Sequence, residues 1–239
     1  MGAKMRTKIL AEDKHILVCF KPPGLAVQSG RIGEMDMVSE LKNYLASASQ
    51  NSSYLGLVHR LDQPVSGLLV FAKTPAAAAG LSRQAAREGE ADAMEKEYRA
   101  LVYLQDGAEC MQEGARLELT DYLQRDGKQN HSRVVTPDTK GAKRARLEVE
   151  MLKKGKEQRH ALVSVRLLTG RHHQIRVQLS HAGMPLLGDA RYGSAESREY
   201  GESLGIRSVC LCACRLCFTH PITGERLEFR TEEMPWKLG

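Results

Sequence analysis

The sequence predicts an α+β fold built around a mixed β-sheet. Strand-like segments outnumber helical ones along the chain, and the two kinds do not alternate strictly. The chain has 239 residues, of which 42% are apolar and 27% are charged, as in ordinary globular proteins. This length can bury a sizeable core in one large domain or two small ones. No apolar run approaches the roughly 18 residues of a spanning helix, so the sequence does not predict an integral membrane protein.

In the first half of the chain, five segments define the expected elements. Ile16–Phe20 is a short apolar run that ends at a Lys-Pro-Pro-Gly turn, which favours a strand. Met35–Ala48 has apolar residues at near-helical spacing and predicts a helix. Leu68–Ala72, preceded by the shorter run Leu55–Val58, is continuously apolar, as in a strand covered on both faces. Pro75–Arg87 is rich in alanine and begins with proline, which favours a helix.

In the second half, further strands are expected over Tyr98–Leu104, Ala145–Leu152, Ala161–Leu168, Val209–Phe218 and Leu227–Phe229. Arg171–Ala182 carries apolar residues at i, i+4 and i+7 and predicts a helix. A Thr-Gly pair ends the strand before it, so the helix N-terminus, a good phosphate site, is expected to follow directly. On this helix His172, Arg176 and Ser180 would line one side.

Positive charge is concentrated in one quarter of the sequence. The formal charge of the chain is +6, but Asp121–Ser180 holds 14 Lys or Arg against 6 Asp or Glu. One cluster is Lys140–Arg146 and another is Lys153–Arg159. Solvated hairpin tips can have the same composition, yet this excess favours a polyanionic partner such as nucleic acid. Aromatic residues make up only 5% of the chain, which is few for a protein that binds single strands by stacking.

The cysteines favour packing over metal binding. Four of the six lie between Cys210 and Cys217, and Cys210, Cys212 and Cys214 alternate. On a strand such residues point one way and cannot surround one ion, whereas zinc sites usually use two separated Cys-x-x-Cys pairs. We therefore expect a buried strand, with a zinc protein as the alternative. No secretory signal is recognisable, so reduced thiols and a cytoplasmic protein are expected.

Three polar segments are candidates for chemistry. His59–Gly67 lies between two apolar runs, where a rigid scaffold can hold an acid, although a turn capped by Asp62 is equally compatible. Lys96 and Tyr98 open a strand and share a face, and taken alone they suit a polar edge strand. Arg171–Arg176 contains two adjacent histidines, which point about 100° apart on a helix and so suggest metal binding only weakly.

Five motifs follow one another in a fixed order and span nearly the whole chain: Lys21–Leu25, His59–Lys73, Lys96–Ala100, Gly170–Gly193 and Phe218–Glu225. At these residues the chain resembles the RluA family of pseudouridine synthases. The resemblance implies an isomerase that converts uridine in rRNA or tRNA to pseudouridine, without metal or organic cofactor. It implies a mixed, mainly antiparallel central sheet flanked by helices and loops. It also implies a single catalytic domain over residues 1–239, without a separate N-terminal RNA-binding domain, and we expect a monomer.

The resemblance also assigns roles to individual residues. Asp62 matches the catalytic aspartate, and Arg176 matches the basic residue paired with it. Tyr98 matches the tyrosine that packs on the target base and removes the C5 proton. Arg60 matches the arginine that fills the gap left by a flipped nucleotide, whose extrusion costs a few kcal/mol. A carboxylate can act as nucleophile or as base, and the sequence leaves both routes open for Asp62.

The remaining expectations concern RNA contacts and two departures from the family pattern. We expect RNA-binding side chains at His59, Arg60, Arg171, His173, Lys153, Lys154 and Lys156. Val65 stands where the family has threonine, which removes a hydroxyl from the catalytic loop, and Cys212 stands where the family often has histidine. A non-catalytic RNA-binding protein on the same fold is the second hypothesis. The presence of Asp62, Tyr98 and Arg176 together favours the enzyme.

Overall fold

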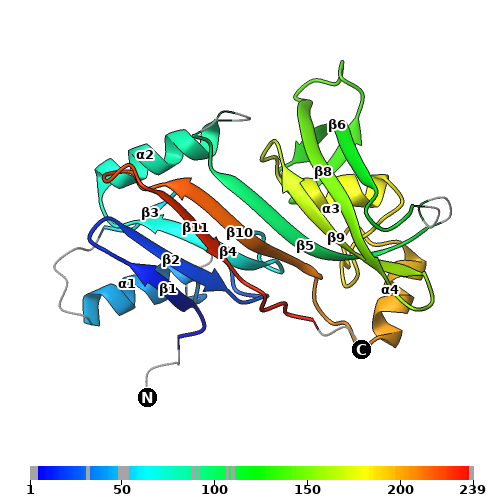
Figure 1. Ribbon diagram of the computed structural model, residues 1–239, viewed down its shortest axis with the longest axis horizontal. Helices are drawn as coiled ribbons and strands as arrows, with labels where there is room; N and C mark the ends of the chain where they lie inside the picture. The colour runs from blue at the N-terminus through cyan, green and yellow to red at the C-terminus, as the bar shows by residue number, and fades with distance from the viewer. Residues whose placement is uncertain are drawn as a thin grey trace. The chain divides into compact units, whose positions relative to one another are not determined.

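The computed structural model describes residues 5–30, 33–47, 54–87, 90, 92–105, 108 and 111–236. The chain divides into two units, whose elements are labelled in Figure 1. The first unit comprises Met1–Lys96 and Cys212–Lys237, and the second comprises Glu97–Leu211 with Leu238–Gly239. The first unit is therefore assembled from two stretches of chain that are far apart in the sequence.

The strands of the first unit are β1 (Lys8–Glu12), β2 (Ile16–Lys21), β3 (Gly56–Leu57), β4 (Ser66–Ala72), β10 (Leu211–Thr219) and β11 (Arg226–Arg230). Their order is β1-β2-β4-β10-β11, and β3 also pairs with β4. The β4–β10 pairing is parallel, and the other pairings in this unit are antiparallel. All seven residues of β4 are buried, which confirms the expected strand covered on both faces.

Two helices, α1 (Met37–Ser47) and α2 (Pro75–Ala86), complete the first unit and confirm the two helices expected there. The side chain of Thr74 caps α2 by accepting a hydrogen bond from Ala77 N, and Pro75 occupies the first turn. Ala77 and Leu81 of α2 belong to a buried cluster with residues of β2, β4 and β10. This apolar packing fixes the framework from which the loop before β4 projects.

The strands of the second unit are β5 (Glu95–Tyr103), β6 (Arg116–Asp126), β7 (His131–Val135), β8 (Lys143–Lys154) and β9 (His160–Leu167). They pair in the order β5-β9-β8-β6-β7, antiparallel throughout. Helices α3 (Gln174–His181) and α4 (Ala195–Ser203) belong to the same unit. Together with the first unit, these pairings confirm the mixed, mainly antiparallel α+β fold.

One face of β8 is buried and the other carries charge. Ala145, Leu147, Val149 and Met151 are all at most 1% exposed, and the residues that alternate with them are charged. On that second face, cross-strand ion pairs join Arg146 to Glu118 at 2.8 Å, Arg166 to Glu148 at 3.3 Å, and Arg116 to Glu150 at 3.2 Å. Part of the basic charge between Asp121 and Ser180 is therefore paired within the sheet.

Strands β1, β6 and β7 and helix α4 are absent from the elements expected from sequence. β6 is the longest of them, and its residues are mostly exposed or half-buried, so the apolar alternation that marks a half-buried strand is weak. β1 and β7 have five residues each, too few for a clear period. Among the described residues, no helix is both long and apolar enough to cross a membrane.

The described cysteines are buried. Cys19, Cys210, Cys212, Cys214 and Cys217 are reduced thiols inside the protein, whereas Cys110 lies outside the described residues. Burial raises the pKa of the Cys210 and Cys212 thiols to about 12, so both are neutral at physiological pH. The expected use of cysteine as a small packing residue in a buried strand is confirmed.

Candidate active site

Asp62 lies on the loop that leads into β4 of the first unit. Its backbone carbonyl accepts a hydrogen bond from Val65 N at 3.0 Å, which closes a four-residue turn. Leu61 and Val65 are buried on either side of it, so the valine at the family's threonine position serves as a packing residue. At Gly67 φ is +129°, and a Cβ there would lie 2.4 Å from Ala213 N, so only glycine fits. The backbone of this turn is therefore fixed.

Lys21, the last residue of β2, braces this turn and is a site residue that the sequence interpretation missed. Its side chain is fully buried. Nζ donates hydrogen bonds to the carbonyl oxygens of Pro22 at 3.0 Å, Leu25 at 2.7 Å and Gln63 at 2.9 Å. Three acceptors match the three N–H donors of a protonated amine. Because lysine is rarely buried, a lysine at the end of an apolar strand is the signal that identifies it.

The amine of Lys21 is also electrostatically coupled to Asp62. Burial lowers the pKa of Lys21 to about 7, and the negative charge of Asp62 acts in the opposite direction. A cation beside a carboxylate favours the ionised carboxylate in return. Lys21 thus holds the loop through its backbone and favours the charged form of the side chain that the loop presents.

His59 and Arg60 precede Asp62 on the same loop and face different surroundings. Arg60 is exposed, as insertion into RNA requires. His59 Nε2 accepts a hydrogen bond from Val70 N at 3.3 Å, and its Nδ1 is buried without a hydrogen-bond partner in the described part of the chain. Burial, followed by the charge of Lys96, lowers the pKa of His59 well below its usual value. The ring is therefore neutral, and it fastens the loop to β4.

Tyr98 lies on β5 in the second unit. It pairs with Val165 of β9 and is 5% exposed. From Tyr98 onward β5 is almost entirely buried, so the polar edge strand that suited this motif in isolation is wrong. The motif lysine, Lys96, is half-buried, and burial lowers its pKa to about 8. Tyr98 is therefore a largely covered aromatic residue in the first half of β5.

Arg176 lies in the first turn of α3 in the second unit and forms a buried ion pair. Its Nε and Nη2 donate to Asp189 Oδ2 at 2.7 Å and to Oδ1 at 2.8 Å, the bidentate arrangement that suits guanidinium and carboxylate. The two residues are 5% and 1% exposed. The guanidinium carbon also lies 5.0 Å from the ring centre of Tyr192. Sequence reasoning missed Asp189, although it follows Gly188 within the fourth motif.

The helix that carries Arg176 begins three residues later than expected. α3 starts at Gln174, and His173 before it has a left-handed φ of 54°. The Gln174 side chain accepts a hydrogen bond from Arg171 N at 2.9 Å, so this amide closes a tight turn. The predictions that His172 lies on the helix face of Arg176, and that the helix N-terminus follows the Thr-Gly pair directly, are therefore wrong.

The two motif histidines connect this turn to the segment between α3 and α4 and to the β6–β7 hairpin. His173 Nδ1 lies 2.7 Å from the Tyr192 hydroxyl. His172 Nδ1 lies 2.8 Å from Ser132 Oγ, and its Nε2 lies 3.1 Å from Asn130 Oδ1. Burial, with Arg176 as the next cause, lowers the pKa of His173 to about 3, so its ring is neutral. In the described part of the chain, no three His, Cys, Asp or Glu side chains gather as a metal site.

The basic clusters lie at opposite ends of β8. Arg144 is at its start, where the Arg144 carbonyl accepts from Arg171 Nε at 2.9 Å. Lys153 and Lys154 are at its end and, with Lys156, form the turn before β9. At about 3.3 Å per residue the two ends are roughly 35 Å apart. The basic stretch is therefore two separate surfaces, and only the first adjoins the Gly170–Gly193 motif.

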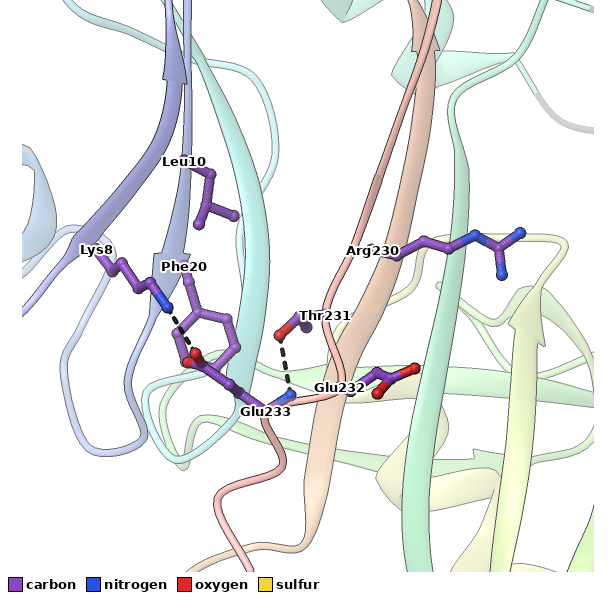
Figure 2. Close-up of a pocket in the computed structure, with 7 residues that line it drawn as sticks. All are labelled: Lys8, Leu10, Phe20, Arg230, Thr231, Glu232 and Glu233. Atoms are coloured by element: carbon purple, nitrogen blue, oxygen red, sulfur yellow. Dashed lines mark hydrogen bonds and ion pairs between the residues drawn. The ribbon is translucent and has the colours of Figure 1, made fainter.

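Two hollows lie away from most of the expected site residues. A hollow of about 420 Å³ in the first unit is lined by Lys8, Leu10, Phe20, Arg230, Thr231, Glu232 and Glu233 (Figure 2). There Lys8 Nζ meets the Glu233 carboxylate at 2.6 Å, and the mixed charge does not suit RNA. A hollow of about 620 Å³ in the second unit is lined by Gln112, Glu113, Lys154, Gly155, Lys156 and Gln158.

Comparison with known proteins agrees with this fold. The family model described as RNA pseudouridylate synthase matches residues 15–181. Ribosomal large subunit pseudouridine synthase D of Zymomonas mobilis is 35% identical over 232 residues, which cover 94% of this chain and 68% of that protein. Ribosomal large subunit pseudouridine synthase C of Escherichia coli K12 is 36% identical over 239 residues, covering 97% and 68%.

Two solved human structures share the fold. RNA pseudouridylate synthase domain containing 1 superposes with a TM-score of 0.70 at 22% identity, covering 98% of this chain and 86% of that one. RNA pseudouridylate synthase domain containing 4 superposes with a TM-score of 0.69 at 23% identity, covering 94% and 88%. With a family match that includes Asp62, Tyr98 and Arg176, the chain belongs to the RNA pseudouridylate synthases, isomerases that convert uridine in RNA to pseudouridine.

Proposed function

We propose that this enzyme modifies a uridine in the RNA of the large ribosomal subunit, with Asp62 as its catalytic carboxylate. The bacterial relatives named for that subunit are 35% and 36% identical to this chain over more than nine-tenths of its length. The observation that carries the assignment of Asp62 is its turn, which Lys21 braces through the Gln63 carbonyl at 2.9 Å. A carboxylate on a fixed turn beside a cation is held ready for reaction.

The reaction is an isomerisation in which every atom is retained. The bond from N1 of uracil to C1′ of ribose breaks, the base turns, and a bond from C5 to C1′ forms. The C5 proton is lost and N1 gains a proton. Asp62 either attacks C1′ as a nucleophile or removes a sugar proton as a base. Both routes need the ionised carboxylate, which the neighbouring charge of Lys21 favours.

We further propose that Tyr98 and Arg176 act on the same uridine as Asp62. Tyr98 packs against the base and accepts the C5 proton. An unperturbed tyrosine has a pKa near 10, so a tyrosine base needs positive charge nearby, and we propose Arg176 as its source. The bidentate pair with Asp189 at 2.7 and 2.8 Å supports this role, because it fixes the guanidinium in orientation.

Binding of RNA is proposed to proceed by base flipping, with the exposed Arg60 in the gap that the nucleotide leaves. His59 supports this loop, and Arg171 and His173 contact RNA near Arg176. The lysines at 153, 154 and 156 contact phosphates farther along the RNA. We propose a monomer in which both units form one catalytic domain. The buried reduced thiols support a reducing cytoplasm as its location.

Mapping pseudouridine in cells that lack the protein tests these assignments. Deletion is expected to remove a small number of marks from large-subunit RNA, and the wild-type chain is expected to restore them. Asp62→Asn keeps the shape of the side chain but removes its charge and should restore none. The matched control Asp138→Asn changes an exposed aspartate in a loop and should restore all of them. If Asp62→Asn restores the pseudouridines, the catalytic assignment of Asp62 is wrong. If deletion removes pseudouridines from tRNA alone, the proposed substrate is wrong.

A further inference from the structure

One oxygen of Asp189 collects donors from Arg176 and from the segment that follows it. Oδ1 accepts hydrogen bonds from Arg176 Nη2 at 2.8 Å, from Arg191 N at 3.0 Å and from Tyr192 N at 3.2 Å. Asp189 is 1% exposed and Arg176 is 5% exposed. Close-packed interiors leave little slack for such groups. A shift of the backbone at 191–192 must therefore move the carboxylate and, with it, the guanidinium.

The side chains of Arg191 and Tyr192 form hydrogen bonds with the tip of the β6–β7 hairpin. Arg191 Nη1 donates to the carbonyl oxygens of Gln129 at 3.0 Å and Asn130 at 2.7 Å. The Tyr192 hydroxyl accepts from Ser132 N at 2.9 Å. Arg191 and Tyr192 thus bind Asp189 through their backbone and the hairpin through their side chains. A continuous set of hydrogen bonds runs from the hairpin tip to Arg176.

The hairpin tip is ordered by its own hydrogen bonds and is basic. Asp126 Oδ1 accepts from Lys128 N at 2.9 Å and from Gln129 N at 3.1 Å, a side-chain turn that fixes the loop. Lys128 is exposed at the tip, and Arg125 and Arg133 are exposed beside it. Exposed cations on a rigid turn suit RNA phosphates, whose contacts position a protein on its substrate.

We propose that Arg191 and Tyr192 are positioning residues that link RNA docking on the β6–β7 turn to the placement of Arg176. Phosphates held by Lys128 fix the hairpin tip, the tip fixes Arg191 and Tyr192, and their backbone fixes Asp189 and its partner Arg176. The inference rests on the proposed function of Arg176. It adds that an RNA phosphate bound at the hairpin further restrains this arginine through Arg191 and Tyr192.

The first test compares Arg191→Met with Arg198→Met, which removes an exposed arginine from α4 as a matched control. Both are assayed for pseudouridine formation on an RNA that the wild-type enzyme modifies. Arg191→Met should keep the wild-type circular dichroism spectrum and lower kcat about tenfold, because a charge-assisted link is lost. Tyr192→Phe should also lower kcat, and Arg198→Met should leave kcat and KM unchanged. A rise in KM alone for Arg191→Met would mean a simple RNA contact and would overturn the proposal.

A double-mutant cycle of Lys128→Met and Arg191→Met tests the link itself. In the wild-type background Lys128→Met should lower kcat, and Lys128→Arg, which keeps the charge, should retain it. In the Arg191→Met background Lys128→Met should lower kcat much less than in the wild type, because only the link from Tyr192 to Ser132 remains. Independent, multiplying effects would overturn the proposal.

Asp62→Asn in the same assay separates this inference from the proposed function. If Asp62→Asn remains active, the catalytic assignment fails, but the cycle still reports whether the hairpin and Arg191 act as one unit. If Asp62→Asn is inactive and the cycle is additive, the proposed function stands and the positioning roles are wrong.

Discussion

Asp62 in the first unit and Arg176 in the second are fixed in opposite ways. The turn of Asp62 is held through its backbone, by Lys21 Nζ on the Gln63 carbonyl at 2.9 Å. Arg176 is held through its functional group itself, by the Asp189 carboxylate at 2.7 and 2.8 Å. The difference suits the proposed roles, because a reacting carboxylate must stay available, whereas a supporting cation only has to stay in place.

Removing the charge of Asp189 should have the largest effect on stability, because it directly breaks the ion pair that holds Arg176. In Asp189→Asn the buried guanidinium of Arg176 loses its bidentate ion pair with this carboxylate, and breaking one side of a buried pair costs about 3–5 kcal/mol. The free energy of unfolding from urea titration at pH 7 should fall by that amount, and pseudouridine formation should fall with it. The exposed control Asp138→Asn should change stability by less than about 0.5 kcal/mol. A loss of under about 1 kcal/mol in Asp189→Asn would show that Arg176 does not depend on this pair.

Lys21→Met tests how the turn of Asp62 is held and should lower the free energy of unfolding by less than Asp189→Asn does. Met fills much of the same space, but three backbone carbonyls lose the donor they share. Unpaired buried acceptors cost about 1–3 kcal/mol, partly offset because a buried amine is no longer desolvated. The free energy of unfolding should therefore fall by about 2–3 kcal/mol. Activity per folded molecule should fall far less than in Asp62→Asn, because Lys21 binds the backbone of the turn. Loss of activity as complete as in Asp62→Asn, in a folded protein, would assign Lys21 a direct part in the reaction.

The same comparison shows which features of the site can be predicted from the sequence. Asp62, Tyr98 and Arg176 stand out because each lies in a motif, and β4 and α2 follow from a continuous apolar run and a Pro-led, alanine-rich segment. Lys21 and Asp189 also lie in motifs, but their motifs do not show which groups these two side chains bind. Lys21 reaches the Gln63 carbonyl, 42 residues later in the chain, and Asp189 reaches Arg176 across 13 residues of turn and helix. Such partners are set by tertiary packing, which local patterns do not encode.

The start of one helix was predicted wrongly and one exposed strand was not predicted, each for a specific physical reason. The start of α3 moves to Gln174 because one side chain accepts the amide of Arg171, a contact that periodicity cannot register. β6 escapes detection because its outward residues pair with charges on β8, as Glu118 does with Arg146 at 2.8 Å. A strand stabilised by cross-strand ion pairs lacks the apolar alternation that predicts a strand.

The smallest predicted effect is the contribution of His173, beside Arg176 in the second unit, to the pH dependence of stability. The pKa of His173 in the folded protein is lowered to about 3 from 6.5, with burial as the main cause and Arg176 the next. Between these values the unfolded chain binds a proton that the folded chain does not, so stability falls as pH falls below 6.5. From pH 7 to pH 5 the free energy of unfolding should drop by about 1–2 kcal/mol more in the wild type than in His173→Asn. Asparagine does not titrate and tolerates the left-handed φ of 54° at this position. Equal pH dependence in urea titrations of both proteins would show that this histidine titrates as in water.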